Sequence, residues 1–272
     1  MTKYKLVVSD LDGTLLDENM QTGEKNDAAI RSLTEKGISF IPSSGRTLHE
    51  IPKSLLENPD IRYVIYSNGT VVYDLKEKKI IISNEISAEA SKKVLDICRK
   101  YDVYICPHYD GNAYSQNLFG KVGMEYYGIN EYYKGILNAL QSYDDISAIE
   151  KREGTFESFV LFFHDDAELD KCKAELSTLD GILVTSSVAH NLEVVSASSG
   201  KGAALREFSR MLGIKKEEII TIGDNANDIS MFEEAGLSLC ASGGTDLAKS
   251  SADMVICSCK DGVADFVLKN II

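Results

Sequence analysis

The sequence predicts an α/β protein with an inserted α+β domain, and three observations carry that prediction. Short apolar runs alternate with amphipathic helical stretches near both ends of the chain, and several of these runs end in polar or acidic residues. Between about residues 84 and 187 the pattern changes to amphipathic strands with interspersed helices, which is typical of an antiparallel sheet. The 272 residues, 44% of them hydrophobic, are enough to fill two cores. We therefore expect one domain of residues 1–83 and 188–272, and a second domain of residues 84–187.

The first apolar run, residues 6–8, is too short for a helix and predicts a strand buried on both faces. It ends in Asp10, Asp12 and Gly13, at the kind of strand end where α/β sheets place their chemistry. Two carboxylates this close repel each other unless a cation or a polar group lies between them. An Asp-Gly turn that closes a hairpin explains the same residues, and on this stretch alone the two interpretations are equally good.

Three further segments combine polar residues with a strand end or a helix start. Ser44–Gly45 stands where N–H groups and a hydroxyl can bind an anion, although an ordinary N-cap is the simpler explanation of this pair. Lys201 opens a predicted helix, where the helix dipole disfavours a cation unless an anion is bound; an exposed lysine in a glycine turn is equally consistent. Asp224, Asn227 and Asp228 follow another apolar run, and a single N-cap cannot explain all three.

Composition limits the classes of partner. The net charge of −13 argues against nucleic acids and anionic membrane surfaces, because both require a basic patch. Apolar runs all fall short of the roughly 20 residues that span a bilayer, so we expect no membrane association. The N-terminus lacks the apolar core and cleavage site of a signal peptide, which predicts a cytoplasmic protein. A monomer or a weak homodimer is expected.

In their order along the chain, four of these segments resemble the motifs of haloacid dehalogenase-superfamily phosphatases, most closely the Cof-like group with a large α+β cap (type IIB). The matching segments are Asp10–Thr14, Ser44–Arg46, Lys201–Gly202 and Gly223–Asp228. Asn68–Gly69 is similar to a family turn near the active site. The resemblance implies a Rossmann-like core, doubly wound around a mostly parallel sheet, with the cap inserted between the second and third motifs.

The resemblance implies that the protein is a Mg²⁺-dependent phosphomonoester hydrolase that forms an aspartyl-phosphate. Asp10 would attack phosphorus, and Asp12 would protonate the leaving group and then deprotonate the attacking water. Mg²⁺ would be held by the side chains of Asp10 and Asp224 and by the backbone carbonyl of Asp12. Asp228 would orient Lys201 or a metal-bound water.

The resemblance also assigns the phosphate-binding residues and the substrate class. Phosphate oxygens would be bound by Ser44, Gly45, Asn68, Lys201 and Asn227. The substrate would be a small phosphorylated metabolite such as a sugar phosphate, selected by the cap, in which Tyr126–Tyr127, Tyr132–Tyr133 and His108 are candidate contacts. One segment departs from the family: Ser242-Gly243-Gly244 replaces a Met-Gly-Asn-Ala-like loop, which puts the contacts of that loop in question.

Two alternative functions stay open. A phosphomutase of the same superfamily would use the same aspartyl-phosphate, and it would be distinguished by an isomerised sugar phosphate in place of free phosphate. A non-catalytic small-molecule binding protein on this fold is disfavoured because both Asp10 and Asp12 are present. The sequence does not identify the physiological substrate.

Overall fold

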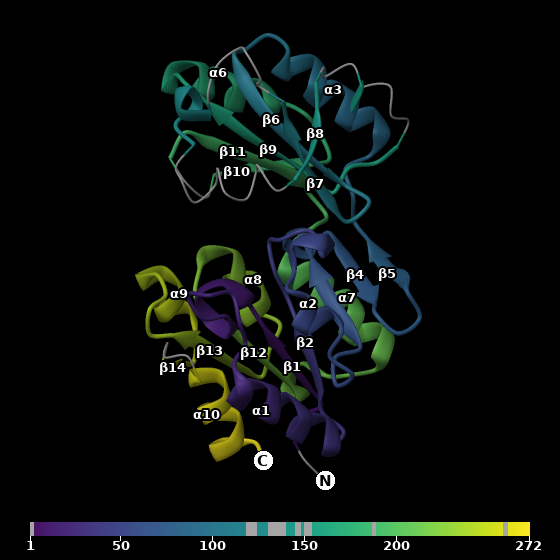
Figure 1. Ribbon diagram of the computed structural model, residues 1–272, viewed down its shortest axis with the longest axis vertical. Helices are drawn as coiled ribbons and strands as arrows, with labels where there is room; N and C mark the ends of the chain where they lie inside the picture. Colours follow the sequence, from purple (N-terminus) through teal and green to yellow (C-terminus); the bar gives the residue numbers. More distant parts are fainter. Residues whose placement is uncertain are drawn as a thin grey trace. The chain divides into compact units, whose positions relative to one another are not determined.

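The computed structural model describes residues 3–117, 124–129, 140–144, 148–149, 154–186, 189–257 and 261–272. The chain divides into two compact units, a core unit of Met1–Ser83 with Ser199–Ile272 and an inserted unit of Asn84–Ser198 (Figure 1). The second boundary of the inserted unit lies beyond the expected residue 187. The reason is that strand β11 (Asn191–Ser196), which we had placed in the core, pairs with strands of the inserted unit.

The core unit is built on a five-stranded parallel sheet in the order β14-β13-β12-β1-β2. The strand bounds are β1 Leu6–Ser9, β2 Ser39–Pro42, β12 Ile219–Gly223, β13 Leu237–Ala241 and β14 Met254–Ile256. Strand β1 lies between β2 and β12, with Val7 opposite Phe40 on one side and Ile220 on the other. Because the three strands are parallel, their carboxyl ends meet at one edge of the sheet.

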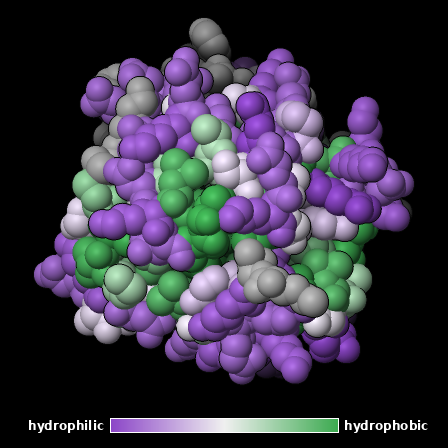
Figure 2. Space-filling model, turned by 90° about the horizontal axis from the view of Figure 1, so that it is seen from below, coloured by the Kyte–Doolittle hydropathy of each residue, from purple (hydrophilic) through white to green (hydrophobic). Residues whose placement is uncertain are grey.

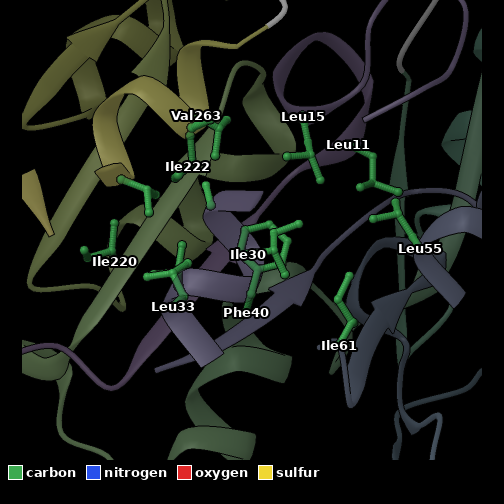
Figure 3. Packing of buried hydrophobic residues seen from close by; sticks show 14 of the residues in the cluster. Leu11, Leu15, Ile30, Leu33, Phe40, Leu55, Ile61, Ile220, Ile222 and Val263 are labelled. Atoms are coloured by element: carbon green, nitrogen blue, oxygen red, sulfur yellow. The ribbon is translucent and has the colours of Figure 1, made fainter. Parts of the chain in front are cut away.

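Helices cover both faces of this sheet, as expected for a doubly wound fold. Helices α1 (Glu24–Glu35) and α10 (Gly262–Asn270) lie on one face, and α7 (Lys201–Leu212), α8 (Ile229–Phe232) and α9 (Asp246–Ser251) lie on the other. The cause is alternation along β1: Val7 belongs to the cluster that contains Ile30 of α1, whereas Val8 belongs to the cluster that contains Phe208 of α7. Figure 3 shows the first of these two clusters.

A three-stranded antiparallel sheet completes the core unit, with β3 Tyr63–Tyr66, β4 Val71–Asp74 and β5 Lys79–Ser83. Residues 47–56 do not form one helix: a 3₁₀ turn at Leu48–Glu50 is followed by a separate helix α2 at Lys53–Leu56. Pro52 stands between them as the N-cap of α2, because a proline has no N–H with which to continue the first turn.

The inserted unit contains a six-stranded sheet in the order β10-β11-β9-β6-β7-β8, antiparallel except for the β7–β8 pair. Its other elements have the bounds α3 Ala88–Cys98, β6 Val103–Tyr109, β7 Asn112–Gln116, β8 Gln141–Tyr143, β9 Ser158–Phe163, α6 Asp166–Leu176 and β10 Ile182–Thr185. One face of the sheet packs against α3 and α6 through a cluster that includes Phe159, Leu161 and Cys172. The predicted Tyr132–Tyr133 pair lies outside the described residues.

The surface carries isolated hydrophobic side chains among many hydrophilic ones. Figure 2, viewed from below, shows a hydrophobic patch surrounded by hydrophilic side chains. Large exposed hydrophobic side chains include Met211, Met254 and Val255. Within the part of the chain that the structure describes, no helix combines the length and the apolar character needed to cross a membrane.

Candidate active site

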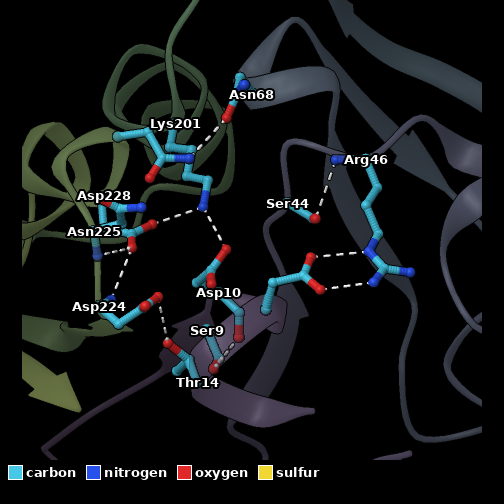
Figure 4. Close-up of polar contacts among 12 residues, drawn as sticks. Ser9, Asp10, Thr14, Ser44, Arg46, Asn68, Lys201, Asp224, Asn225 and Asp228 are labelled. Carbon is cyan, nitrogen blue, oxygen red and sulfur yellow. Dashed lines mark hydrogen bonds and ion pairs between the residues drawn. The ribbon is translucent and has the colours of Figure 1, made fainter. Parts of the chain in front are cut away.

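Residues from three separate chain segments meet at the carboxyl edge of the core sheet (Figure 4). Asp10 directly follows β1, Lys201 is the first residue of α7, and Asp228 precedes α8. The Nζ atom of Lys201 lies 2.6 Å from Oδ1 of Asp10 and 2.6 Å from Oδ1 of Asp228. Lys201 is only 1% exposed, so the interpretation as an exposed lysine in a flexible turn is wrong.

Asp228 is fully buried, and its carboxylate accepts from three donors. Oδ1 accepts from Lys201, and Oδ2 accepts from the backbone N–H groups of Asp224 at 2.9 Å and Asn225 at 3.0 Å. Asp228 therefore fixes the loop after β12 and the Lys201 ammonium at the same time. An N-cap role alone does not account for it, because the contact to Lys201 joins residues 27 positions apart.

Asp224 lies against the turn that follows β1. Its Oδ1 accepts a hydrogen bond of 3.1 Å from the hydroxyl of Thr14, a contact that the sequence did not predict. Gly13 has a φ of +80°, and a Cβ atom at this position would lie 2.5 Å from Oδ2 of Asp224. Only glycine fits there, for both conformational and steric reasons. The acid turn at Asp10–Thr14 is therefore shaped to receive Asp224, which a hairpin turn would not require.

The site holds more negative charge than its lysine offsets. Oxygen atoms of Asp10, Asp224 and Asp228 all lie within 4.8 Å of one another. Burial is the main cause that raises the pKa of Asp10, to about 8. The neighbouring Asp228 and Asp224 carboxylates also raise this pKa, whereas Lys201 lowers it. Burial and the Asp228 charge also raise the pKa of Asp224. Burial opposes the charged form of Lys201, but Asp10 and Asp228 outweigh that effect and raise its pKa. A hard divalent cation fits this set, since it binds carboxylate oxygens and would offset the excess charge.

A second group of predicted residues comes together beside the carboxylates. The Oδ1 atom of Asn68 accepts a 2.9 Å hydrogen bond from Nδ2 of Asn227. The backbone N–H of Asn68 donates to the carbonyl of Ser44 at 3.0 Å, and a Cβ atom on Gly45 would lie 3.1 Å from Oδ1 of Asn68. Ser44 is buried, and its hydroxyl accepts from the N–H of Arg46 at 3.2 Å. All of the predicted phosphate-binding residues are thus adjacent to one another or to the carboxylates.

A strained turn joins these two groups. Ser67, Asn68 and Gly69 have φ values of 49°, 53° and 85°, all in the left-handed region. Two consecutive non-glycine residues there are costly, and such strain persists only where the surroundings enforce it. A Cβ atom on Gly69 would lie 2.2 Å from the carbonyl carbon of Gly200, so glycine lets this turn pack directly against the start of α7. The turn therefore positions Asn68 beside Lys201.

Asp12 does not join the carboxylate cluster. Its two carboxylate oxygens face Arg46, with Oδ1 at 2.6 Å from Nη2 and Oδ2 at 2.9 Å from Nε. Sequence reasoning missed this partner, although Arg46 belongs to one of the recognised motifs and a guanidinium in a partly buried turn requires an acceptor.

The unusual Ser242–Gly244 loop retains a backbone role at the site. The N–H of Thr245, directly after it, donates to the carbonyl of Asp224 at 2.8 Å, and the N–H of Gly244 donates to the carbonyl of Ala241 at 2.9 Å. The loop therefore supports the Asp224 backbone, and it needs glycine at position 244, where a Cβ atom would lie 2.5 Å from the carbonyl oxygen of Asp224.

Comparison with known proteins agrees with this geometry. The family model for haloacid dehalogenase-like hydrolases matches residues 7–267. The 5-amino-6-(5-phospho-D-ribitylamino)uracil phosphatase YwtE of Bacillus subtilis is 29% identical over 97% of this chain and 96% of its own length. A Thermotoga maritima protein of known structure is 28% identical, with a TM-score of 0.82 over 98% of this chain and 97% of that one. A subclass IIB sugar phosphatase, 20% identical, shares the fold with a TM-score of 0.79 over 98% of this chain and all (100%) of its own.

The chain belongs to the haloacid dehalogenase-like hydrolase family. It is a phosphatase of that family, and its fold, a parallel core sheet with an inserted mixed sheet, is shared with the subclass IIB sugar phosphatase.

Proposed function

We propose that this protein is a Mg²⁺-dependent phosphomonoester hydrolase that works through an aspartyl-phosphate on Asp10. The observation that carries the proposal is the placement of the Lys201 ammonium, buried and 2.6 Å from both Asp10 and Asp228, beside the third carboxylate of Asp224. Phosphoryl transfer needs an in-line nucleophile, neutralised equatorial oxygens and a protonated leaving group. Each requirement has a candidate residue here.

Asp10 is the proposed nucleophile. It directly follows β1 on the rigid core sheet, and Lys201 occupies one of its oxygens, which orients the other. Attack forms a bond from an Asp10 oxygen to phosphorus and breaks the bond from phosphorus to the leaving-group oxygen. A water molecule then attacks phosphorus, which releases phosphate and restores the Asp10 carboxylate.

Asp12 is the proposed general acid and base. It is separate from the buried carboxylates and is 44% exposed, so it can exchange protons with an incoming hydroxyl group or water. It would give a proton to the leaving oxygen in the first step and take one from the attacking water in the second.

Asp10 and Asp224 are the proposed side-chain ligands of Mg²⁺, with the Asp12 carbonyl as a third ligand. Asp228 is better suited to an orienting role, because three donors already occupy its two oxygens. When bound, Mg²⁺ would neutralise charge on the phosphoryl group during transfer.

The proposed phosphate contacts are Ser44, Gly45, Asn68, Lys201 and Asn227. One hydrogen bond, from Nδ2 of Asn227 to Oδ1 of Asn68, holds these two side chains beside each other. Since amide and ammonium groups donate to any phosphate monoester, these contacts would bind the shared phosphate and would not distinguish leaving groups.

We assign the selection of the leaving group to the inserted unit. We propose that the substrate is a metabolite similar to a sugar phosphate. YwtE is named for a phosphorylated ribityl compound and a structural neighbour is a sugar phosphatase, and both names describe polyhydroxylated phosphate esters. At 29% identity, the particular substrate in the name of YwtE is not assigned to this chain.

The test is phosphate release from a panel of sugar phosphates, nucleotides, pyridoxal phosphate and flavin mononucleotide, with Mg²⁺ and with chelator. We expect free phosphate in equal amount to the dephosphorylated product. An isomerised sugar phosphate would identify a mutase instead, and no turnover of any ester with Mg²⁺ would contradict the proposal.

A further inference from the structure

The ion pair between Asp12 and Arg46 joins the proposed general acid to a residue that has no role in the proposed chemistry. It is bidentate: two different guanidinium nitrogens donate to the two different carboxylate oxygens, at 2.6 Å and 2.9 Å. Planar, two-point pairing fixes the orientation of a carboxylate as well as its position, which a lysine cannot do. Asp12 is 44% exposed, so the burial of its surroundings does not hold it in place.

Arg46 is itself held rigidly. Its Nη1 donates to the carbonyl of Glu50 at 3.0 Å, and its side chain is 19% exposed. Glu50 is fixed in turn by the N–H and the hydroxyl of Thr47, at 2.9 Å and 2.8 Å. The backbone of Arg46 accepts from the N–H of Ser67 at 2.8 Å. The guanidinium is therefore anchored to the loop after β2 independently of Asp12.

We propose that Arg46 is a positioning residue for Asp12: it aims the carboxyl group that exchanges protons with the leaving group. The inference rests on the proposed function and adds to it. The two hydrogen bonds from Arg46 are the contacts that orient the Asp12 carboxylate, and they hold it by both of its oxygens. Proton transfer requires alignment within hydrogen-bond distance, and a misaligned acid loses rate without losing substrate binding.

A leaving-group comparison tests this role. The variants are Arg46→Gln, Arg46→Lys and Arg46→Gln in an Asp12→Asn background. The substrates are p-nitrophenyl phosphate, whose leaving group needs no proton, and the best alkyl phosphate from the panel. Arg62→Gln is the matched control, because Arg62 also pairs with an aspartate of the core unit, Asp74, at 2.9 Å.

We expect Arg46→Gln to lower kcat on the alkyl ester at least about tenfold more than on the aryl ester, with KM changed less than about threefold. Arg46→Lys should retain an intermediate rate, and Arg46→Gln should add less than about a twofold loss once Asp12 is Asn. Arg62→Gln should leave the alkyl-to-aryl ratio unchanged. Melting curves establish whether each variant is folded at the assay temperature. If Arg46→Gln is unfolded at that temperature, the comparison is made with Arg46→Lys.

Three results would overturn the proposal: equal losses on both esters, a rise in KM at unchanged kcat, or a full loss that persists in the Asp12→Asn background. Failure of the proposed function itself is distinguishable, because it would appear in the unsubstituted protein as absent phosphate release, or as unimpaired turnover by Asp10→Asn.

Discussion

Lys201 Nζ lies 2.6 Å from Asp10 Oδ1, although the two residues are 191 positions apart in the chain. The same nitrogen is equally close to Asp228. This contact links the first strand of the core sheet to the first helix after the inserted unit. It joins the motifs at the two ends of the chain into one site.

Replacement of Asp10 by Asn should reduce turnover at least about a thousandfold, because an amide does not attack phosphorus. Steady-state phosphate release measures this. Asp180→Asn is the matched control, since Asp180 is exposed in the inserted unit, and it should keep full activity. Activity of Asp10→Asn within about tenfold of the unsubstituted protein would exclude Asp10 as the nucleophile.

Lys201→Met should lower the stability of the metal-free protein by about 3–5 kcal/mol, because it leaves two buried carboxylates without their cation. Thermal and denaturant unfolding measure the loss. Lys171→Met removes an exposed lysine from α6 and should change stability by less than about 0.5 kcal/mol. An unchanged unfolding midpoint for Lys201→Met would mean that the buried ion pairs contribute little.

Chelation should abolish activity and added Mg²⁺ should restore it, whereas Ca²⁺ should inhibit because its larger and looser coordination shell fits the site poorly. Asp224→Ala should raise the Mg²⁺ concentration needed for half-maximal rate at least about tenfold. Titration of activity against free Mg²⁺ gives both values. Full turnover in excess chelator would rule out the metal requirement.

Asp74 should make a pH-dependent contribution to the stability of the core unit. Its carboxylate is 1% exposed and accepts from Arg62 and from the N–H groups of Lys76 and Glu77. Burial alone would raise its pKa, but these hydrogen bonds outweigh burial and lower it. A lowered folded-state pKa stabilises the protein above the unfolded-state pKa, and the contribution is lost as pH falls through the folded-state pKa.

Asp74→Asn should therefore destabilise by about 1–3 kcal/mol at neutral pH and by less below about pH 4. Urea unfolding at a series of pH values gives the two curves. Curves that stay parallel across this range would contradict the assignment.

Leaving-group preference should follow the inserted unit. Exchange of Asn84–Ser198 for the matching segment of a relative with a different substrate should transfer the substrate ranking. Acetyl phosphate, which has almost no leaving group to recognise, should be hydrolysed at a rate within about threefold of the parent. A folded chimera that keeps the original substrate ranking would contradict this prediction. It would favour the core loops at Asn68 and Ser242 as the elements that select the leaving group.

The elements, and the residues that meet at the candidate site, were largely predictable because each depends on a local pattern; the roles of those residues stay predictions. The apolar run before Asp10 and the helix beginning at Lys201 were both read from a few neighbouring residues. Strand β11 was assigned to the wrong unit because its alternation of buried Leu192 and Val194 with half-buried Glu193 is compatible with either sheet. Pairing partners depend on residues far away in the chain, and no local pattern encodes them.

The same reasoning explains the contacts that were missed. The bond between Thr14 and Asp224 spans 210 positions, and the pair between Arg46 and Asp12 spans 34. Both lie inside motifs that were recognised. A motif, however, identifies residue types at a site and does not say which of them face each other.

The most direct measurement is chemical trapping of the phosphorylated residue. The protein is mixed with a rapidly hydrolysed ester and Mg²⁺, quenched in acid during turnover, and reduced with borohydride, which converts an aspartyl-phosphate to homoserine. Peptide mass spectrometry then locates the change. We expect homoserine at position 10, dependent on substrate and absent from Asp10→Asn. Phosphate release without any modification at Asp10, or with the label on another residue, would contradict it.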